Sequence, residues 1–316
     1  MKSFGKILAT FAILLFSAIS LNAQDIAAAT ELFNSGVNAL NAKNYTVALD
    51  NFNKALKMAE GLGEEGAAIV KDSKDLIPKL YLYSGQDLAK ANKADDAVEQ
   101  LKKATDAAKL YGNSEIEKEA SELILKVLSA DAGQYFNDTM YPEAIEAYKK
   151  VLAINPSNGA AYLGIGMAET KLNNEAGAVA AFTKAIELGE KESASKQLAT
   201  IYLKKASAAY GAKGFAAALE SAKKSNEYLA SSMALKLAGL SASNLKKYDE
   251  AIAILNAYLV AEPNATDKDN MYYYLAGAFE AKANVAKACE FYKKILANPT
   301  FKAAAEYKVK TQLKCK

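Results

Sequence analysis

Histidine, arginine and tryptophan are absent from this 316-residue chain, and all 39 of its basic residues are lysines. Without histidine there is no imidazole base, no Ser-His or Cys-His nucleophile pair and no histidine-containing zinc site. Without arginine there is no planar guanidinium to hold a phosphate, a carboxylate or a guanine base through two parallel hydrogen bonds. We therefore expect a protein that is not an enzyme and has no catalytic, cofactor-binding or metal-binding residues.

Proline and glycine are also scarce. Only 5 prolines and 17 glycines interrupt a chain rich in Ala, Leu, Lys and Glu, residues that lose little conformational freedom in a helix. No stretch alternates for long as a half-buried strand does, so we expect an all-α protein. The formal net charge is only +3, and this balance attracts neither nucleic acid nor an anionic membrane surface.

The first 23 residues have the layout of a secretory signal peptide. Lys2 and Lys6 precede an almost wholly apolar run over residues 7–21, and the chain turns polar at Asn22 with Ala23 available for cleavage. A run of about 15 residues rises only about 22 Å as a helix, which is too short for the hydrocarbon core of a membrane. We expect cleavage after Ala23, no membrane span afterwards, and a periplasmic or secreted protein.

A fixed spacing recurs along the rest of the chain. A small residue is followed twelve positions later by alanine in seven places, and a large residue stands four positions before each small one. The seven pairs are Gly36 and Ala48, Gly85 and Ala97, Ala132 and Ala144, Gly166 and Ala178, Ala206 and Ala218, Gly239 and Ala251, and Ala276 and Ala288. This spacing predicts seven antiparallel helical hairpins, with the small residue meeting the alanine where the two backbones come closest.

Bulky residues complete the pattern. Four positions after the alanine, six of the seven units carry Phe52, Leu101, Tyr148, Phe182, Leu255 or Tyr292, whereas the remaining unit carries Ala222. With these residues, and with the segment from Tyr135 to Tyr148 as the clearest copy, residues 27–299 resemble the tetratricopeptide repeat family. The resemblance implies a right-handed α-solenoid of about seven hairpins, because no single hairpin can bury its apolar face alone.

The spacing between units suggests how the chain is divided. The first two units are longer than the others, so we expect two long repeats over residues 24–124, five repeats over 125–299 and a capping helix over 300–316. Phe301, Ala305, Val309 and Leu313 mark the buried face of that last helix.

The first helices of the hairpins are expected to line a concave groove that binds a partner. The positions that should face it lie just after the large residue, and one and four positions after the small residue. These positions are Phe33, Val37, Leu40, Leu82, Gln86, Phe136, Leu163, Met167, Leu203, Tyr210, Lys236, Leu240 and Tyr273. Most are apolar or aromatic, and the alternative is that they pack against neighbouring helices. Because Lys236 is followed four positions later by Leu240, the clamp that some family members use for a carboxylate terminus is not expected.

Cys289 and Cys315 are the only cysteines, and in an oxidising compartment they could form a disulfide. If the last two helices fold back on each other at Pro299, the two cysteines are offset by six residues, about 9 Å of helix rise. A disulfide needs Cα atoms closer than about 7 Å, so a bridge requires the chain end to bend back. The sequence leaves both states open.

These observations favour a non-catalytic scaffold or adaptor in the periplasm or envelope. It would bind an extended peptide or an amphipathic helix of a partner protein, and the family resemblance suggests support of an envelope or secretion complex. One alternative is a secreted or cell-surface module for contact with a host. Another is a peptidoglycan-active hydrolase, which would need paired carboxylates in a cleft, and no pair stands apart from the solvated helix faces.

Overall fold

The computed structural model describes residues 4–316, and side chains from Ala23 onward. Over this range the protein contains fifteen α-helices and no strand, so the all-α prediction is confirmed. Most of the predicted signal peptide lies outside the residues whose side chains are described, and its cleavage stays a prediction. Among the described residues, no helix is both long and apolar enough to cross a membrane.

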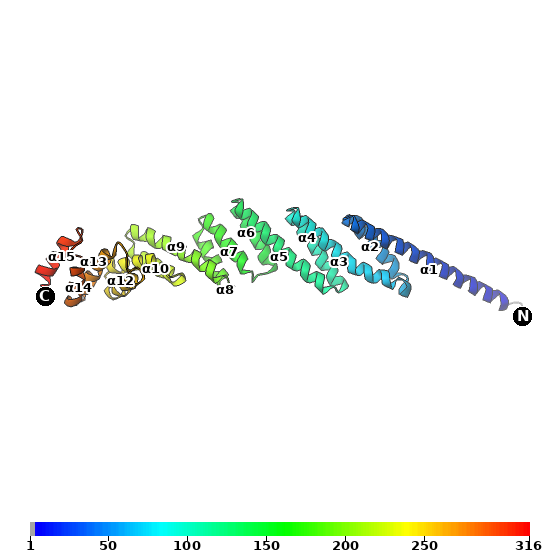
Figure 1. Cartoon of the computed structure of the whole chain (residues 1–316). Coiled ribbons are helices and arrows are strands. Elements are labelled where there is room, and N and C mark those ends of the chain that lie inside the picture. The colour runs from blue at the N-terminus through cyan, green and yellow to red at the C-terminus, as the bar shows by residue number, and fades with distance from the viewer. Residues whose placement is uncertain (1–3) are drawn as a thin grey trace. The chain divides into compact units, whose positions relative to one another are not determined.

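The chain divides into two compact units, Met1–Pro156 and Ser157–Lys316, and each is described by itself. In each unit consecutive helices pack as antiparallel hairpins in chain order (Figure 1). The first unit contains α1 (Phe4–Asn41), α2 (Tyr45–Glu60), a 3-10 turn (Gly63–Gly66), α3 (Ala67–Lys90), α4 (Ala94–Tyr111), α5 (Ser114–Asn137) and α6 (Tyr141–Ile154). Because α5 runs through residue 124 without a break, the predicted boundary at 124 falls inside a helix.

The second unit contains the remaining four hairpins and the chain end. Its helices are α7 (Gly159–Lys171), α8 (Glu175–Glu187), α9 (Lys191–Gly211), α10 (Phe215–Tyr228), α11 (Ser232–Asn244), α12 (Tyr248–Ala261), α13 (Lys268–Ala281), α14 (Val285–Lys294) and α15 (Lys302–Tyr307). A single π-helical turn (Lys308–Gln312) follows α15. Each of the seven predicted small-residue pairs joins the two helices of one hairpin, so the α-solenoid of seven hairpins is confirmed. Its handedness stays a prediction.

The small residues are buried for a reason that differs from the predicted one. A Cβ atom placed on Gly166 would lie 2.6 Å from two ring carbons of Phe182, and one on Gly239 would lie 2.5 Å from Leu255. Gly36 and Gly85 meet Phe52 and Leu101 in the same way. In these four hairpins the glycine therefore makes room chiefly for the bulky side chain sixteen positions later, rather than for the alanine twelve positions later.

All seven turns between the helices of a hairpin have the same backbone geometry. Seven positions after each small residue, one residue adopts the left-handed conformation with φ between 56° and 63°, and none of these residues is glycine. They are Lys43, Asn92, Thr139, Asn173, Lys213, Lys246 and Ala283. The next N–H bonds back to a carbonyl five residues earlier, as Asn174 does to Glu169 at 2.9 Å. Each first helix thus ends in a Schellman-type turn.

The predicted capping helix is shorter than expected. Only Lys302–Tyr307 is α-helical, and the wider turn after it is closed by the N–H of Leu313, which donates to the carbonyl oxygen of Lys308 at 2.9 Å. Ala305 and Val309 are buried and Phe301 and Leu313 are half-buried against the last hairpin. The predicted buried face of the segment is therefore confirmed.

Candidate partner-binding surfaces

A hollow in the first unit lies between α3 and α5 and has a volume of about 590 Å³. Leu123, Val127 and Ala130 of α5 form its apolar floor together with Ala89 and Ala94. Its polar edge consists of Gln86, Lys90, Asn92, Glu119, Glu122, Lys126, Asp131 and Gln134. We refer to this site as the α3–α5 hollow.

Three edge residues of the α3–α5 hollow are held by hydrogen bonds or ion pairs. The Gln86 side-chain amide donates to the Glu119 carboxylate at 3.2 Å, which links the two walls. The Lys90 ammonium lies 3.4 Å from Asp87, and the Asp87 carboxylate also accepts a 2.8 Å hydrogen bond from the Tyr45 hydroxyl. Burial and this hydrogen bond raise the pKa of Tyr45 to about 12. Lys90 is thus engaged by Asp87.

The pKa of Asp131, on the edge of the α3–α5 hollow, is raised above its ordinary value. Burial is the main cause, and repulsion from Asp95 adds to it, whereas the Lys150 ammonium opposes it. Lys150 is itself paired with Asp95 at 3.1 Å. The Asp131 carboxylate is therefore a desolvated negative charge that a cationic group in the hollow would stabilise.

This shift predicts a pH-dependent effect of replacing Asp131. Because the folded pKa lies above its ordinary value of 3.8, ionised Asp131 costs stability at neutral pH, and the cost disappears as the pH falls below that ordinary value. We expect Asp131→Asn to be more stable than the wild type at pH 7 and equal to it near pH 3. Denaturant unfolding at both pH values measures the difference.

Asp106→Asn, an exposed change on α4, serves as the control and should alter the free energy of unfolding little at either pH. A destabilised Asp131→Asn variant at pH 7 would show that the carboxylate makes a favourable contact in the folded protein.

Most of the predicted groove residues of the first unit pack against other side chains of the same unit. Leu82 is buried, with 1% of its surface exposed, so it belongs to the core and was wrongly assigned to the groove. Phe33 packs edge-on against Phe52 with ring centroids 5.2 Å apart, and Phe136 packs edge-on against Tyr141 at 5.4 Å. Val37 and Leu40 are half-buried against the same cluster as Phe33. Gln86 is the member that lines the α3–α5 hollow.

In the second unit, Leu240 is also buried and its assignment to the groove was likewise wrong. Leu163 and Met167 are half-buried against the cluster around Phe182. Leu203 and Tyr210 are half-buried against the cluster that contains Ala206. These residues fill seams between helices.

Lys236 and Tyr273 do reach hollows of the second unit. Lys236 forms an ion pair with Asp267 at 2.5 Å, in a hollow of about 360 Å³ that Tyr258 also lines. Tyr273 lies in another hollow of about 460 Å³, which we refer to as the tyrosine hollow. Its lining includes Tyr248, Tyr273, Tyr274, Tyr292, Glu280 and Lys308.

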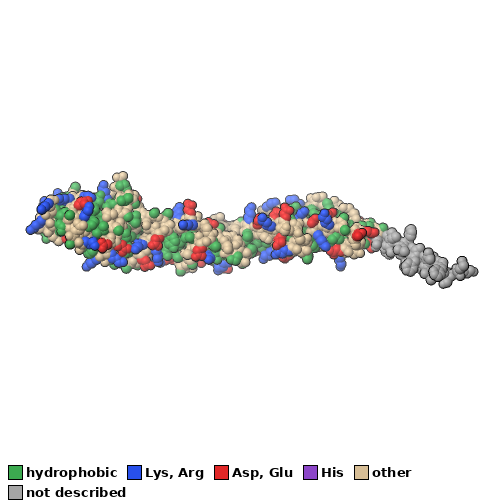
Figure 2. All heavy atoms as spheres, turned by 90° about the horizontal axis from the view of Figure 1, so that it is seen from below, with side chains coloured by type: hydrophobic (Ala, Val, Ile, Leu, Met, Phe, Trp, Pro, Cys, Tyr) green, Lys and Arg blue, Asp and Glu red, His purple; other side chains and the backbone are tan. Residues whose placement is uncertain are grey.

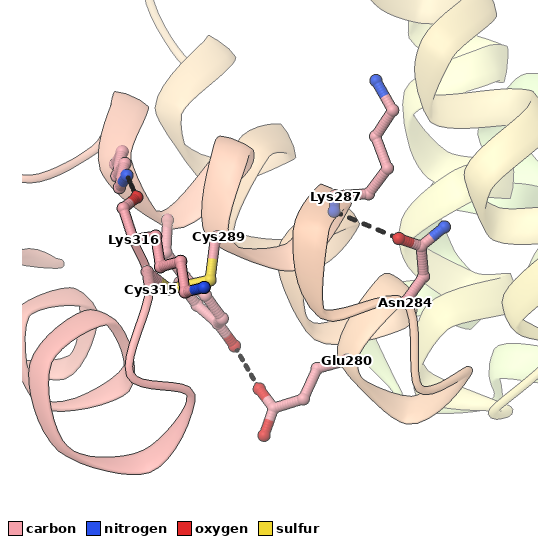
Figure 3. Close-up of a disulfide and its surroundings, with 8 residues drawn as sticks. Glu280, Asn284, Lys287, Cys289, Cys315 and Lys316 are labelled. Carbon is pink, nitrogen blue, oxygen red and sulfur yellow. Dashed lines mark hydrogen bonds between the residues drawn. A yellow bond between two sulfur atoms is a disulfide. The ribbon is translucent and has the colours of Figure 1, made fainter.

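Cys289 and Cys315 form a disulfide in the structure, with Cα atoms 5.7 Å apart (Figure 3). The chain end bends back to reach Cys289 through the π-helical turn and the left-handed residue Lys314. This bend removes the six-residue offset expected for two straight helices.

The described surface was also searched for metal-ligand groups and charged patches. No group of three or more acidic or cysteine side chains in the described part of the chain could hold a metal ion. On the face shown in Figure 2, lysines and acidic residues are interspersed with hydrophobic side chains.

Comparison with known proteins finds a similarity to a known repeat in one stretch of the chain. The family model for the tetratricopeptide repeat matches residues 134–193, which span parts of both units. None of the curated proteins matches the chain in sequence.

Among solved structures, YrrB, described as a TPR protein with an unusual peptide-binding site, is 18% identical, with 57% of this chain and 90% of YrrB covered and a TM-score of 0.33. The TPR domain of P58(IPK) is 16% identical, with 91% and 99% covered and a TM-score of 0.32. A tetratricopeptide repeat protein from Parabacteroides merdae is 16% identical, with 90% and 98% covered and a TM-score of 0.27.

Proposed function

Because the chain folds as consecutive helical hairpins and residues 134–193 match the tetratricopeptide repeat, we propose that it is a non-catalytic scaffold that holds a partner protein in the α3–α5 hollow. Repeat solenoids of this kind present extended surfaces to other proteins. The finer proposal is that an extended peptide or one face of an amphipathic helix of the partner enters this hollow.

The observation that carries the proposal is the combination of an apolar floor with a polar edge. A volume of about 590 Å³ lies within the 300–1,000 Å³ typical of binding clefts. Leu123 and Val127 lie four residues apart on α5 and offer apolar contact, while the edge groups can orient a bound backbone. A partner would therefore insert apolar side chains between α3 and α5.

The charges on the edge favour a basic partner. Glu119, Glu122 and Asp131 face the α3–α5 hollow, whereas Lys90 is engaged by Asp87 and only Lys126 opposes the acidic groups. An ammonium group near Asp131 would also stabilise the ionised carboxylate and so offset the burial and repulsion that raise its pKa. We infer that the partner segment is apolar and carries at least one lysine or arginine.

The apolar run at residues 7–21 and the polar exit at Asn22 support export to the periplasm or beyond. We propose that the scaffold acts there in an envelope or secretion complex. N-terminal sequencing of the protein from an envelope fraction should find Gln24 as the first residue, and an intact Met1 on a cytoplasmic species would refute export.

Affinity capture with the full chain tests the α3–α5 hollow. Leu123→Ala removes floor contacts and Asp131→Asn removes a half-buried charge, so each should weaken partner capture from envelope extracts by about 1–3 kcal/mol, roughly 5- to 150-fold. Asp131→Asn is especially informative because it is expected to stabilise the fold while it weakens binding.

Leu110→Ala is the matched control, since Leu110 is exposed on α4 and does not line the hollow. Its capture should equal that of the wild type. Undiminished capture by both hollow variants would rule out this surface as the binding site.

A further inference from the structure

Residues 300–316, here named the C-terminal strap, lie against the last hairpin. Ala305 and Val309 are buried there, and the ring of Phe301 is stacked on that of Tyr273 with centroids 5.0 Å apart. Tyr273 in turn packs edge-on against Tyr292, at 6.4 Å. The strap therefore covers an aromatic surface that the hairpin would otherwise present to solvent.

Glu280 of α13 is the polar centre of this contact. Its carboxylate accepts hydrogen bonds from Lys308 at 2.7 Å and from Gln312 at 2.8 Å, both in the strap. The Tyr292 hydroxyl donates to the other oxygen at 2.9 Å. With the strap in place the Glu280 side chain is only 18% exposed, and loss of the strap would remove the ammonium group of Lys308 from this carboxylate.

The strap is fastened at its far end. The disulfide joins Cys315 to Cys289 of α14, and the Lys293 ammonium donates to the backbone carbonyl of Lys316. In the middle of the strap, the Lys308 side chain forms part of the wall of the tyrosine hollow. The strap thus makes an aromatic contact and two hydrogen bonds to the hairpin, as a bound peptide would, and the disulfide holds it there.

We propose that the face of the last hairpin formed by Tyr273 and Glu280, beside the tyrosine hollow, is a second binding site for a basic and aromatic helical segment of a partner. The disulfide-fastened strap covers this face at rest. The strap itself defines the ligand chemistry. Phe301 and Lys308 are seven residues apart, about two helical turns, so a helix with an aromatic residue and a lysine at that spacing could satisfy both Tyr273 and Glu280. This site is separate from the α3–α5 hollow and does not depend on it.

Release of the strap requires a dithiol reductant. One thiolate of the reductant attacks the sulfur of Cys315, because Cys289 is buried, with 8% exposed, and Cys315 is half-buried. The Cys289 thiolate leaves and a mixed disulfide forms on Cys315. The second thiol of the reductant then displaces the Cys315 thiolate and closes its own disulfide. Two electrons pass from the dithiol to the protein, and the cysteine thiolates take protons from the medium.

Hydrogen exchange of the full chain tests the fastening. Dithiothreitol should speed amide exchange in residues 302–315 at least tenfold while exchange in α9 and α10 stays unchanged. Equal protection of the strap before and after reduction, with two free thiols verified by counting, would overturn the role of the disulfide.

A binding experiment tests the site. The probe is a labelled synthetic peptide with the sequence of residues 300–316 and Cys315→Ser. The full chain with Phe301→Ala, Lys308→Ala and Cys315→Ser, whose own strap is weakened, should bind it at least tenfold more tightly than the oxidised wild type. Adding Glu280→Gln, or using a probe with Lys308→Ala, should abolish that gain.

Exchange protection in α13 and α14 checks that the opened variant keeps its last hairpin. If it does not, Cys315→Ser alone, which retains the strap's side-chain packing, takes its place with the same expected order of affinities. Equal probe binding by opened and oxidised protein, or binding insensitive to Glu280→Gln, would refute the proposal.

Discussion

Replacing Phe182 with alanine should lower the free energy of unfolding of the second unit by about 3–5 kcal/mol. The Phe182 ring is fully buried between α7 and α8 and packs against the backbone of Gly166. Truncation removes the apolar contacts of the ring and leaves a cavity that the rigid hairpin can only partly close. Denaturant unfolding monitored by circular dichroism measures the loss.

Phe279→Ala is the comparison, because Phe279 is only half-buried against its core cluster. A smaller loss is expected there. A change below about 1 kcal/mol for Phe182→Ala would contradict the packing described for this hairpin.

The reciprocal substitution, Gly166→Ala, should destabilise the same hairpin by about 1–3 kcal/mol. The new methyl group would lie 2.6 Å from the Phe182 ring, so the ring or the helix must move. This outcome is opposite to that expected from helix propensity, since alanine is favoured over glycine within a helix by about 1 kcal/mol.

Gly277→Ala provides the matched control, because the added methyl group has no neighbour within 4 Å other than its own helix backbone and adjacent residues. It should be neutral or stabilising. Combining Gly166→Ala with Phe182→Ala should cost less than the two separate losses together, since the methyl group enters the space that the ring vacates. Ala206 and Ala222 are a natural pair of this kind, both fully buried. Additive losses would mean that the two positions are not in contact.

The repeat spacing was sufficient to predict the hairpins. Two helices that pack closely need a small residue on one helix where a bulky side chain of the other lies, so these residues recur at fixed positions. The spacing did not identify which side chain meets the small residue. Gly85 illustrates the difficulty: an added Cβ would lie 2.6 Å from Leu101 but also 3.2 Å from the carbonyl oxygen of Ala97. Both neighbours are close, and only coordinates distinguish the tighter contact.

The binding surfaces were predicted less well. Leu82 and Leu240 occupy the positions of Leu163 and Met167, yet they are buried, because the burial of each position depends on the neighbouring hairpin. The α5 face that contains Leu123 and Asp131 was missed, although the wide spacing of the first units indicated longer first helices. Glu280 could not be identified from the sequence, since its donors come from a chain end whose bend has no periodic signal.

The seven left-handed turn residues restrict which insertions and deletions the row of hairpins can tolerate. Each costs roughly 1 kcal/mol as a non-glycine residue in that conformation, and the packing of the hairpin that it closes must offset the cost. Duplication or deletion of a segment running from one such residue to the next would preserve every turn together with the small and bulky partners on either side. An insertion of any other length within a hairpin would separate a turn from its packing. Natural length variants of this protein should therefore differ by whole hairpins, and engineered ones should be cut at the same points.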